Sequence, residues 1–190
     1  MNTTAVVGKK TLDMVYIGVF AVIIAICSWI TLPFGMVSFT MQTFAVFLTV
    51  GVLGGKRGTM AVLVYLLLGV IGVPVYAGFG SGIGAILGQE GGYLIGFLFS
   101  ALVMWAVEKL LGRKTWMLAT AMVLGMMVCY AFGTLWFMAV YARNTGAVGL
   151  VTVLGWCVFP FILPDLVKIV LALMLTKRLL GIIGMEGAGR

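Results

Sequence analysis

Asp165 and Lys168 are the residues whose types and spacing most clearly allow ligand chemistry. They lie three positions apart in the apolar run 161–171, so on a helix they share one face. In lipid an exposed charge costs about 2.5–3.5 kcal/mol even on the lenient insertion scale, so both side chains should point into the protein. They form either a structural ion pair that fixes the last helix, or a recognition site. In a recognition site Asp165 accepts hydrogen bonds from ligand N–H groups, while Lys168 binds an anionic or carbonyl oxygen.

Pro164 favours the recognition site. A proline inside a helix frees a carbonyl one turn earlier, because it has no N–H to donate. Irregular backbone at membrane depth is tolerated only where it lines protein or a cavity. The proline therefore favours recognition over a purely structural ion pair, since the freed carbonyl must face either protein or a cavity.

The segment Gly78–Tyr93 is a second candidate, because glycines recur at positions 80, 84, 88, 92 and 96. Small residues four apart allow helices to pack closely in lipid. Alternatively, bare backbone comes close to a ligand and donates N–H groups. The adjacent glycines 91 and 92 and the polar pair Gln89 and Glu90 interrupt any single helix, which favours a loop. The spacing is not a nucleotide fingerprint, because no strand precedes it.

A third feature is Ala21–Val–Ile–Ile–Ala25, in which two small residues lie four positions apart. This pattern predicts a close helix contact. The sequence alone leaves open whether Ala21 and Ala25 contact another helix of the same chain or a partner.

Catalytic and metal chemistry has little support. The sequence has no histidine, and Cys27, Cys129 and Cys157 lie in apolar runs without paired spacing, so we interpret them as packing residues. We therefore expect no metal site and no cofactor. An enzyme is disfavoured, because no serine or cysteine nucleophile lies beside a base and only one carboxylate is placed in an apolar run.

The elements that position these residues must be membrane helices. Of 190 residues 63% are hydrophobic and 9% charged, with a mean hydropathy of +1.24, whereas soluble chains carry about 25% charged residues. Apolar runs long enough to form helices cover residues 14–32, 38–54, 58–74, 92–111, 115–141 and 148–177. The prolines in the last run predict a separate short helix or a kinked start. The predicted fold is an all-α integral membrane protein with six transmembrane helices in one compact bundle.

The basic residues predict the orientation, because Lys and Arg are retained on the cytoplasmic side of short loops. Basic clusters fall on one side when the chain starts inside: at 9–10, 56–57, 109–114 and 177–178. The opposite loops, 33–37, 75–91 and 142–147, carry only Arg143 as a base. Both termini are then cytoplasmic: an N-terminal segment 1–13, a membrane domain 14–180 and a mobile tail 181–190. Because topology accounts for the net charge of +7, a nucleic-acid role is disfavoured.

Several ordered motifs resemble the BioY family, the biotin-specific substrate-binding S-components of energy-coupling factor (ECF) transporters. The resemblance covers roughly residues 12–180. It rests on the sequences at 39–48 (FTMQTFAVFL), 54–58 (GGKRG), 65–78 (YLLLGVIGVPVYAG), 91–97 (GGYLIGF) and 163–168 (LPDLVK). It implies six membrane helices with both termini inside, and a glycine-rich outer loop between the third and fourth helices that closes over biotin.

The resemblance also implies roles for single residues. Asp165 and Lys168 become biotin contacts, and Ala21 and Ala25 face the transmembrane coupling subunit. We expect Gly80, Ser81 and Gly82 to close the loop over the ligand, and Tyr93 to stack on it or hydrogen-bond it. The expected substrate-binding set is Asp165, Lys168, Tyr93, Gly80, Ser81, Gly82, Gly91 and Gly92. Aromatic walls are expected from Phe79, Tyr93 and Trp156.

The sequence departs from the family at one point. Many members carry proline and then threonine or serine where this chain has Gln89 and Glu90. A carboxylate beside a site for an anionic vitamin is unhelpful unless it faces water. We therefore exclude Glu90 from the expected ligand contacts.

The expected function is biotin capture on the outer side of the bacterial cytoplasmic membrane and delivery inward. The sequence has no phosphate-binding loop of the Gly-x-x-x-x-Gly-Lys-Ser/Thr type. Energy is therefore expected from partners, namely a coupling membrane protein and two ATP-binding cassette ATPases. Two alternatives remain: an S-component for another vitamin, and a stand-alone biotin facilitator.

Overall fold

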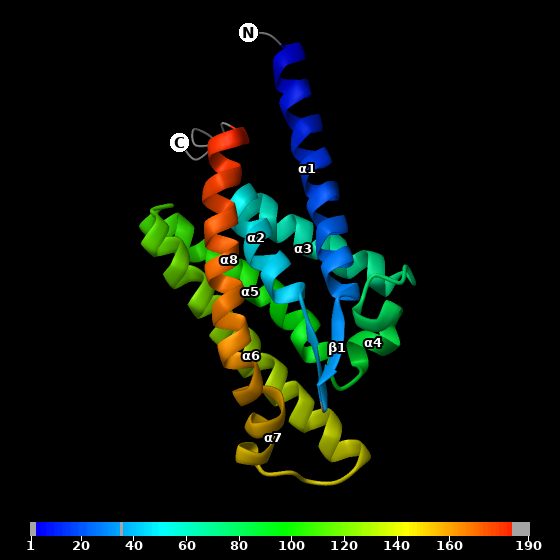
Figure 1. The fold of residues 1–190 in the computed structure, drawn as a ribbon. Helices are drawn as coiled ribbons and strands as arrows, with labels where there is room; N and C mark the ends of the chain where they lie inside the picture. The colour runs from blue at the N-terminus through cyan, green and yellow to red at the C-terminus, as the bar shows by residue number, and fades with distance from the viewer. Residues whose placement is uncertain (1–2, 35, 184–190) are drawn as a thin grey trace.

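The computed structural model describes residues 3–34 and 36–183, which are mostly helical (Figure 1). Two short strands form an antiparallel hairpin between the first two helices. In chain order the elements are α1 (Thr3–Trp29), β1 (Thr31–Phe34), β2 (Val37–Thr40), α2 (Gln42–Leu53), α3 (Gly55–Val70), η1 (Ala77–Phe79), α4 (Ile83–Leu87), α5 (Gly91–Leu111), α6 (Thr115–Asn144), α7 (Leu150–Cys157) and α8 (Phe159–Ile183). Each of the six predicted apolar runs contains a helix.

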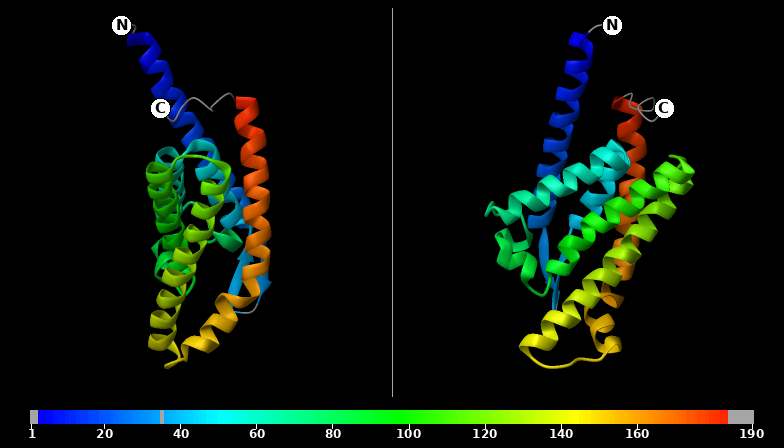
Figure 2. Two further views of the ribbon diagram at one scale, coloured as in Figure 1. Left: turned by 90° about the vertical axis from the view of Figure 1, so that its left-hand side faces the viewer. Right: turned by 180° about the vertical axis from the view of Figure 1, so that it is seen from behind.

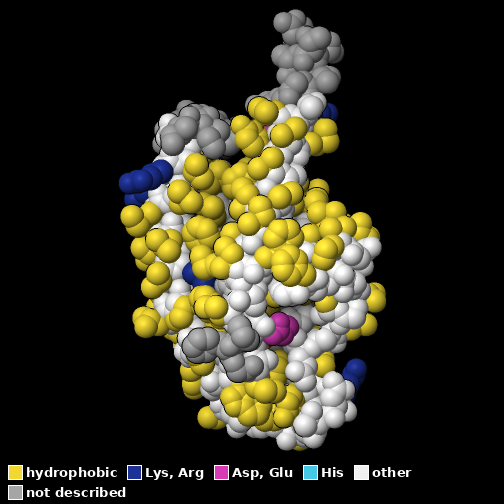
Figure 3. Space-filling model, turned by 45° about the vertical axis from the view of Figure 1, so that its right-hand side comes forward, with side chains coloured by type: hydrophobic (Ala, Val, Ile, Leu, Met, Phe, Trp, Pro, Cys, Tyr) yellow, Lys and Arg dark blue, Asp and Glu magenta, His cyan; other side chains and the backbone are white. Residues whose placement is uncertain are grey.

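Four helices of the described chain are long and apolar enough to cross a membrane. These segments are Lys10–Trp29, Gly91–Leu111, Thr115–Asn144 and Phe159–Gly181. The surface agrees with this assignment, since hydrophobic side chains are spread over the face in Figure 3 and charged groups are few. Apolar side chains on the outside of such helices contact lipid hydrocarbon at no cost, whereas water would solvate them poorly. The exposed apolar surface therefore indicates a membrane protein.

The β-hairpin is the main difference from the predicted fold. The predicted helix 14–32 ends at Trp29, and the predicted helix 38–54 begins only at Gln42. Thr31 pairs with Thr40, and the Met41 N–H donates to the Ile30 carbonyl at 3.2 Å, which closes the base of the hairpin. Apolar and polar residues alternate along β2, as in a half-buried strand, whereas β1 carries one polar residue followed by three apolar ones.

The chain ends also differ from the predicted boundaries. The segment predicted to precede the membrane domain is helical from Thr3 onward and continues into α1, which projects beyond the other helices (Figure 1). Asp13 forms an ion pair with Arg57 of α3 at 3.1 Å. Residues 181–183 of the predicted mobile tail extend α8, and residues 184–190 lie outside the described chain.

The last predicted run divides into two helices, so the structure has the separate short helix, the first of the two predicted possibilities, and not a kinked start. α7 ends at Cys157 and α8 begins at Phe159, with Val158 outside helical geometry between them. Pro160 lies in the first turn of α8, where a helix does not need the missing N–H. Pro164 lies inside α8, one residue before Asp165.

Small residues form the seam between α5 and α6, which lie side by side in both views of Figure 2. A Cβ at Gly92 would overlap Trp136, and one at Gly133 would overlap the Tyr93 ring. A Cβ at Gly96 would lie 3.0 Å from Cys129 Sγ. The two helix backbones therefore approach closely, as small residues four apart permit.

Glu108 and Arg113 join the α5–α6 turn to the α2–α3 turn. The Glu108 carboxylate accepts the Gly55 N–H at 2.6 Å, and Arg113 donates to the Gly51 carbonyl at 2.5 Å. Both turns lie at the end of the molecule that carries the two termini (Figure 1). This contact gathers the predicted basic clusters at positions 56–57 and 109–114 at one end.

Candidate functional site

Asp165 and Lys168 form a buried ion pair on α8. Lys168 Nζ donates to Asp165 Oδ1 at 2.7 Å, and each residue is 3% exposed. Their i, i+3 spacing places both charges on the inward face of the helix, as the sequence predicts. A buried charge is tolerated only when it is paired and hydrogen-bonded, and this pair satisfies the first condition.

The second condition is met by residues from two other elements. The Tyr130 hydroxyl of α6 donates to Asp165 Oδ2 at 2.5 Å. Lys168 Nζ also donates to the Thr40 carbonyl at 2.7 Å and lies 4.0 Å from the centre of the Phe39 ring. An ammonium has three donors and a carboxylate about four acceptor positions. Within the described residues one Lys168 N–H makes no hydrogen bond, although the ammonium also contacts the Phe39 ring, and part of the Asp165 acceptor capacity is unused. Both are available to a ligand.

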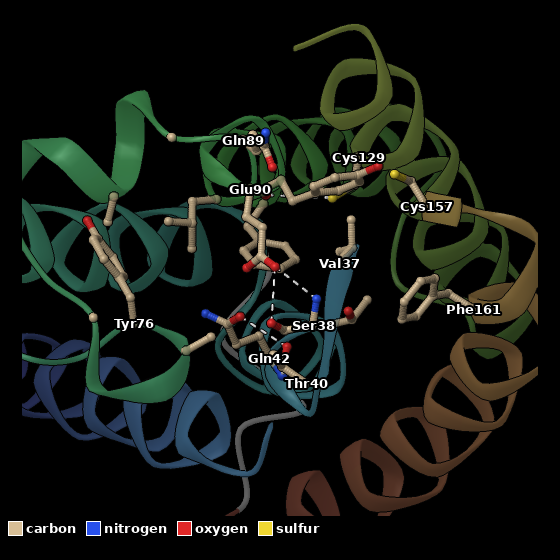
Figure 4. Close-up of a pocket in the computed structure, with 18 of the residues that line it drawn as sticks. Val37, Ser38, Thr40, Gln42, Tyr76, Gln89, Glu90, Cys129, Cys157 and Phe161 are labelled. Atoms are coloured by element: carbon tan, nitrogen blue, oxygen red, sulfur yellow. Dashed lines mark hydrogen bonds between the residues drawn. The ribbon is translucent and has the colours of Figure 1, made fainter. Parts of the chain in front are cut away.

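The charged pair lies in the wall of a cavity of about 600 Å³. Figure 4 shows side chains from the hairpin, the loop before α5, α6 and α8 pointing into it. Its polar lining includes Ser38, Thr40, Gln42, Glu90 and Tyr130, and its apolar lining includes Val37, Leu94, Phe97, Met126 and Phe161. An apolar cavity with a few convergent polar groups is the usual form of a small-molecule site.

Gln42 is held by a series of hydrogen bonds and ring contacts that also includes Tyr76 of the cavity wall. Its Oε1 accepts from Thr40 Oγ1 at 3.0 Å, and its Nε2 donates to the Tyr65 hydroxyl at 2.5 Å. The Tyr65 ring packs edge-on against Tyr76, whose hydroxyl donates to the Leu66 carbonyl at 2.6 Å. Burial raises the pKa of Tyr76 to about 12, so this phenol remains a neutral donor. This series of contacts fixes one amide in the cavity wall.

Four of the eight predicted substrate contacts line this cavity: Asp165, Lys168, Tyr93 and Gly80. Ser81, Gly82, Gly91 and Gly92 are not in its wall. Gly82 has φ +82 and its N–H donates to the Gly69 carbonyl at 2.7 Å. Gly91 and Gly92 pack against the Ile86 carbonyl and the Trp136 side chain, where a Cβ would overlap both. These glycines are needed for turns and close packing.

Two of the three predicted aromatic walls are also displaced. Phe79 is 63% exposed and stacks on Trp29, with 5.1 Å between ring centres. Trp156 packs against Tyr141 outside the cavity wall. Tyr93 lines the cavity as predicted, and the other aromatic lining residues are Tyr76, Phe97, Tyr130 and Phe161.

Ala21 and Ala25 face the interior of this chain. They are 1% and 5% exposed and belong to the hydrophobic core, where α1 packs against α2 and α3. The close helix contact predicted from their spacing is therefore internal in this conformation. A contact of these two alanines with a partner subunit would require α1 to separate from its neighbours.

Glu90 lies in the cavity wall, although sequence reasoning excluded it from the site. Its Oε1 accepts hydrogen bonds from the Ser38 N–H at 2.9 Å and from Ser38 Oγ at 3.0 Å (Figure 4). These bonds connect the loop before α5 to strand β2.

The glycines that recur every four residues divide between two roles. Gly80, Gly84 and Gly88 line the cavity, while Gly92 and Gly96 pack against α6.

Sequence reasoning missed Tyr130, Thr40 and Gln42 as members of the site. Thr40 and Gln42 belong to the motif at 39–48 that carries the family resemblance, which is a usable signal. Tyr130 had no signal, because a single tyrosine in an apolar run is typical of membrane helices.

The family model for BioY matches residues 1–184. The chain belongs to the BioY family. A biotin transporter BioY of Thermotoga maritima is 39% identical over 169 residues, which cover 88% of this chain and 95% of the relative. A probable biotin transporter BioY of Pyrococcus horikoshii is 34% identical over 172 residues, which cover 90% and 98%.

A solved structure has the same fold as this BioY protein. It is the crystal structure of the S-component for biotin from an ECF-type ABC transporter, with a TM-score of 0.80 and 26% sequence identity. The match covers 94% of each chain. BioY proteins are thus transporter components rather than enzymes, as the sequence predicts.

Proposed function

We propose that this BioY protein binds biotin in the cavity beside Asp165 and Lys168 and acts as the S-component of an ECF-type transporter. The observation that carries the proposal is the buried ion pair, which has free hydrogen-bonding capacity facing a cavity of about 600 Å³. A structural ion pair would need no cavity beside it. A biotin site requires both the cavity and the unused donors and acceptors.

The ureido ring of biotin matches the charged pair. It offers two N–H donors and one carbonyl oxygen, which is the complement of the remaining Asp165 acceptors and the third Lys168 donor. Because Asp165 and Lys168 neutralise each other, their combined field suits an uncharged polar ring. The Tyr130 hydroxyl and the Thr40 carbonyl hold the two side chains in place before the ligand arrives. Such preorganisation reduces the entropy lost on binding.

The apolar part of biotin fits the remaining walls. Leu94, Phe97, Met126 and Phe161 offer hydrocarbon surface to the thiophane ring and the alkyl tail. Gly80, Gly84 and Gly88 present bare backbone from the loop between α3 and α5. We propose this loop as the outer cover of the site, with Gly80 and Tyr93 retained as contacts from the predicted set.

The topology proposal has six crossings with both termini in the cytoplasm. The two termini lie at one end of the molecule, which fits an even number of crossings (Figure 1). The basic turns near Arg57 and Arg113 lie at this end too, in agreement with the charge rule. α2 is short for a membrane crossing, and we propose that the hairpin before it spans the rest of the membrane thickness. The loop beside the cavity then faces outward in the cell membrane.

Transport requires energy from other subunits. The connections between the helices of the described chain are short, and the sequence carries no phosphate-binding loop. We propose a membrane coupling subunit and two ATPases as partners. Inward delivery would follow a change in the position of this protein relative to the coupling subunit.

Titration of the purified protein with biotin tests the proposed function. We expect saturable binding at one site per chain, and biotin in the mass spectrum of whatever copurifies with the protein. Riboflavin and thiamine serve as competitors. We expect that neither vitamin displaces biotin. A protein that binds riboflavin or thiamine but does not bind biotin would contradict the proposal.

Tyr130→Phe is expected to weaken biotin binding by roughly tenfold. The substitution removes the hydrogen bond to Asp165 Oδ2 but keeps the ring, and a hydrogen bond to a charged group contributes about 1.5–3 kcal/mol. Isothermal titration of both proteins measures the change. Tyr141→Phe is the matched control, since Tyr141 stacks on Phe137 outside the cavity wall. Equal affinities of Tyr130→Phe and the unmodified protein would remove Tyr130 from the site.

A further inference from the structure

Glu90 is a third charged side chain in the wall of the cavity, and the proposed binding mode leaves it without a role. The sequence predicts no ligand contact for Glu90, because a carboxylate is unhelpful to an anionic vitamin unless it faces water, yet the residue lines the cavity. The Ser38 N–H and Oγ both donate to Oε1, so the carboxylate is held in one position (Figure 4). Oε2 retains its acceptor capacity.

Helix capping does not account for Glu90. The residue lies at the N-cap of α5, where a carboxylate commonly accepts hydrogen bonds from the first turn. Its side chain makes no such bond to α5 and turns to strand β2 instead, 52 residues away in the sequence. The hairpin therefore fixes the carboxylate in the cavity wall rather than at the helix end.

The charges of the cavity wall do not cancel. Asp165 and Lys168 neutralise each other at 2.7 Å, which leaves the Glu90 carboxylate as one net negative charge. The other ionisable side chains of the described wall are tyrosines and cysteines, which are ordinarily uncharged at neutral pH. Arg143, the single base of the predicted outer loops, is exposed and lies outside the wall.

We infer that Glu90 sets the charge preference of the site, so that it disfavours a ligand with an anionic tail relative to the same ligand with a neutral tail. The inference rests on the proposed function. A cavity of about 600 Å³ is roughly 10 Å across, which is about one Debye length, so a biotin carboxylate anywhere inside it is repelled by Glu90. Biotin amide differs only in lacking that charge. The repulsion therefore acts on biotin and spares the amide, whatever the orientation of the ligand.

The test compares biotin and biotin amide on the unmodified protein and on Glu90→Gln. We expect Glu90→Gln to tighten biotin binding by roughly five- to tenfold, as expected for one unit charge at this range in a partly screened site, and to leave biotin amide within about twofold. Both ligands are titrated on the same preparation, so the ratio of the two dissociation constants is the result. Glu90→Thr also removes the charge and should give the same ratio of dissociation constants. It replaces Glu90→Gln in the test if that variant folds poorly.

Ser38→Ala is the matched control, because it removes a hydrogen bond to Glu90 without changing the charge. The ratio of the two dissociation constants should change less in Ser38→Ala than in Glu90→Gln. Equal effects of Glu90→Gln on both ligands, or the same change in Ser38→Ala, would reduce Glu90 to a bridge to the hairpin and overturn the inference. Failure of the unmodified protein to bind either ligand would contradict the proposed function itself.

Discussion

Asp165→Leu is expected to weaken biotin binding by at least about 100-fold and to destabilise the protein. The substitution removes the acceptors that face the ligand and leaves Lys168 buried without its ion pair. Breaking a buried pair by removing one partner costs about 3–5 kcal/mol, because the remaining charge is uncompensated. Isothermal titration measures the first effect, and the thermal midpoint in detergent measures the second.

The double variant Asp165→Leu/Lys168→Met separates the two interpretations that the sequence leaves open. Removal of both charges is expected to restore most of the lost stability, since no unpaired charge remains. It should not restore biotin binding, because the ligand still lacks its polar partners. Recovery of both stability and binding in the double variant would show that the pair is structural only.

Asp13→Ala provides the matched control for this series. Asp13 also forms an ion pair, with Arg57 at 3.1 Å, but the two side chains are 31% and 22% exposed. Exposed ion pairs contribute about 0–1 kcal/mol, since water already solvates both charges. We expect the thermal midpoint and the biotin affinity of Asp13→Ala to stay close to those of the unmodified protein.

Gly92→Ala and Gly133→Ala are expected to lower the thermal midpoint strongly. Each new methyl group would overlap a side chain of the facing helix, Trp136 in the first case and Tyr93 in the second. Overpacking of this kind costs about 1–3 kcal/mol, because the helices or the rings must shift. Gly133→Ala should also weaken biotin binding, since Tyr93 lines the cavity.

Gly155→Ala is the control for the seam, because no atom lies within 4 Å of a Cβ at that position. It should leave the thermal midpoint unchanged or slightly raised. A midpoint of Gly92→Ala equal to that of Gly155→Ala would contradict the close packing of α5 and α6.

Hydropathy predicts the long helices well, because each must be apolar over about 20 residues regardless of its neighbours. The predicted ranges 92–111 and 115–141 differ from α5 and α6 by at most three residues at any boundary. The hairpin is missed, because two four-residue strands disappear within a helix-length average. The alternation of apolar and polar residues in β2 is a signal that only a two-residue period detects, and β1 carries no such alternation.

The site is predictable only in part, and the reason is physical. Asp165 and Lys168 can be recognised alone, because charge in an apolar run is rare and must be paired or hydrated. Their partners cannot, since Tyr130 is 35 residues from Asp165 and Thr40 is 128 residues from Lys168. Only the packing of α6 and the hairpin against α8 brings these groups together.

The glycines illustrate the same limit. A spacing of four predicts helix packing and a ligand-facing loop equally well, and both occur here in one series. Gly84 lines the cavity while Gly96 packs against Cys129, and the difference depends on which neighbour each residue meets. The alanine pair is similar, since its inward orientation depends on how α1 docks on α2 and α3.

A crystal structure with biotin bound tests the central claim most directly. We expect density for the ligand inside the cavity, with polar atoms of its ureido ring within about 3 Å of Asp165 and Lys168. The loop that carries Gly80 should lie over it. Biotin bound at another place, or an empty cavity in crystals of protein shown to be saturated with biotin, would contradict the account.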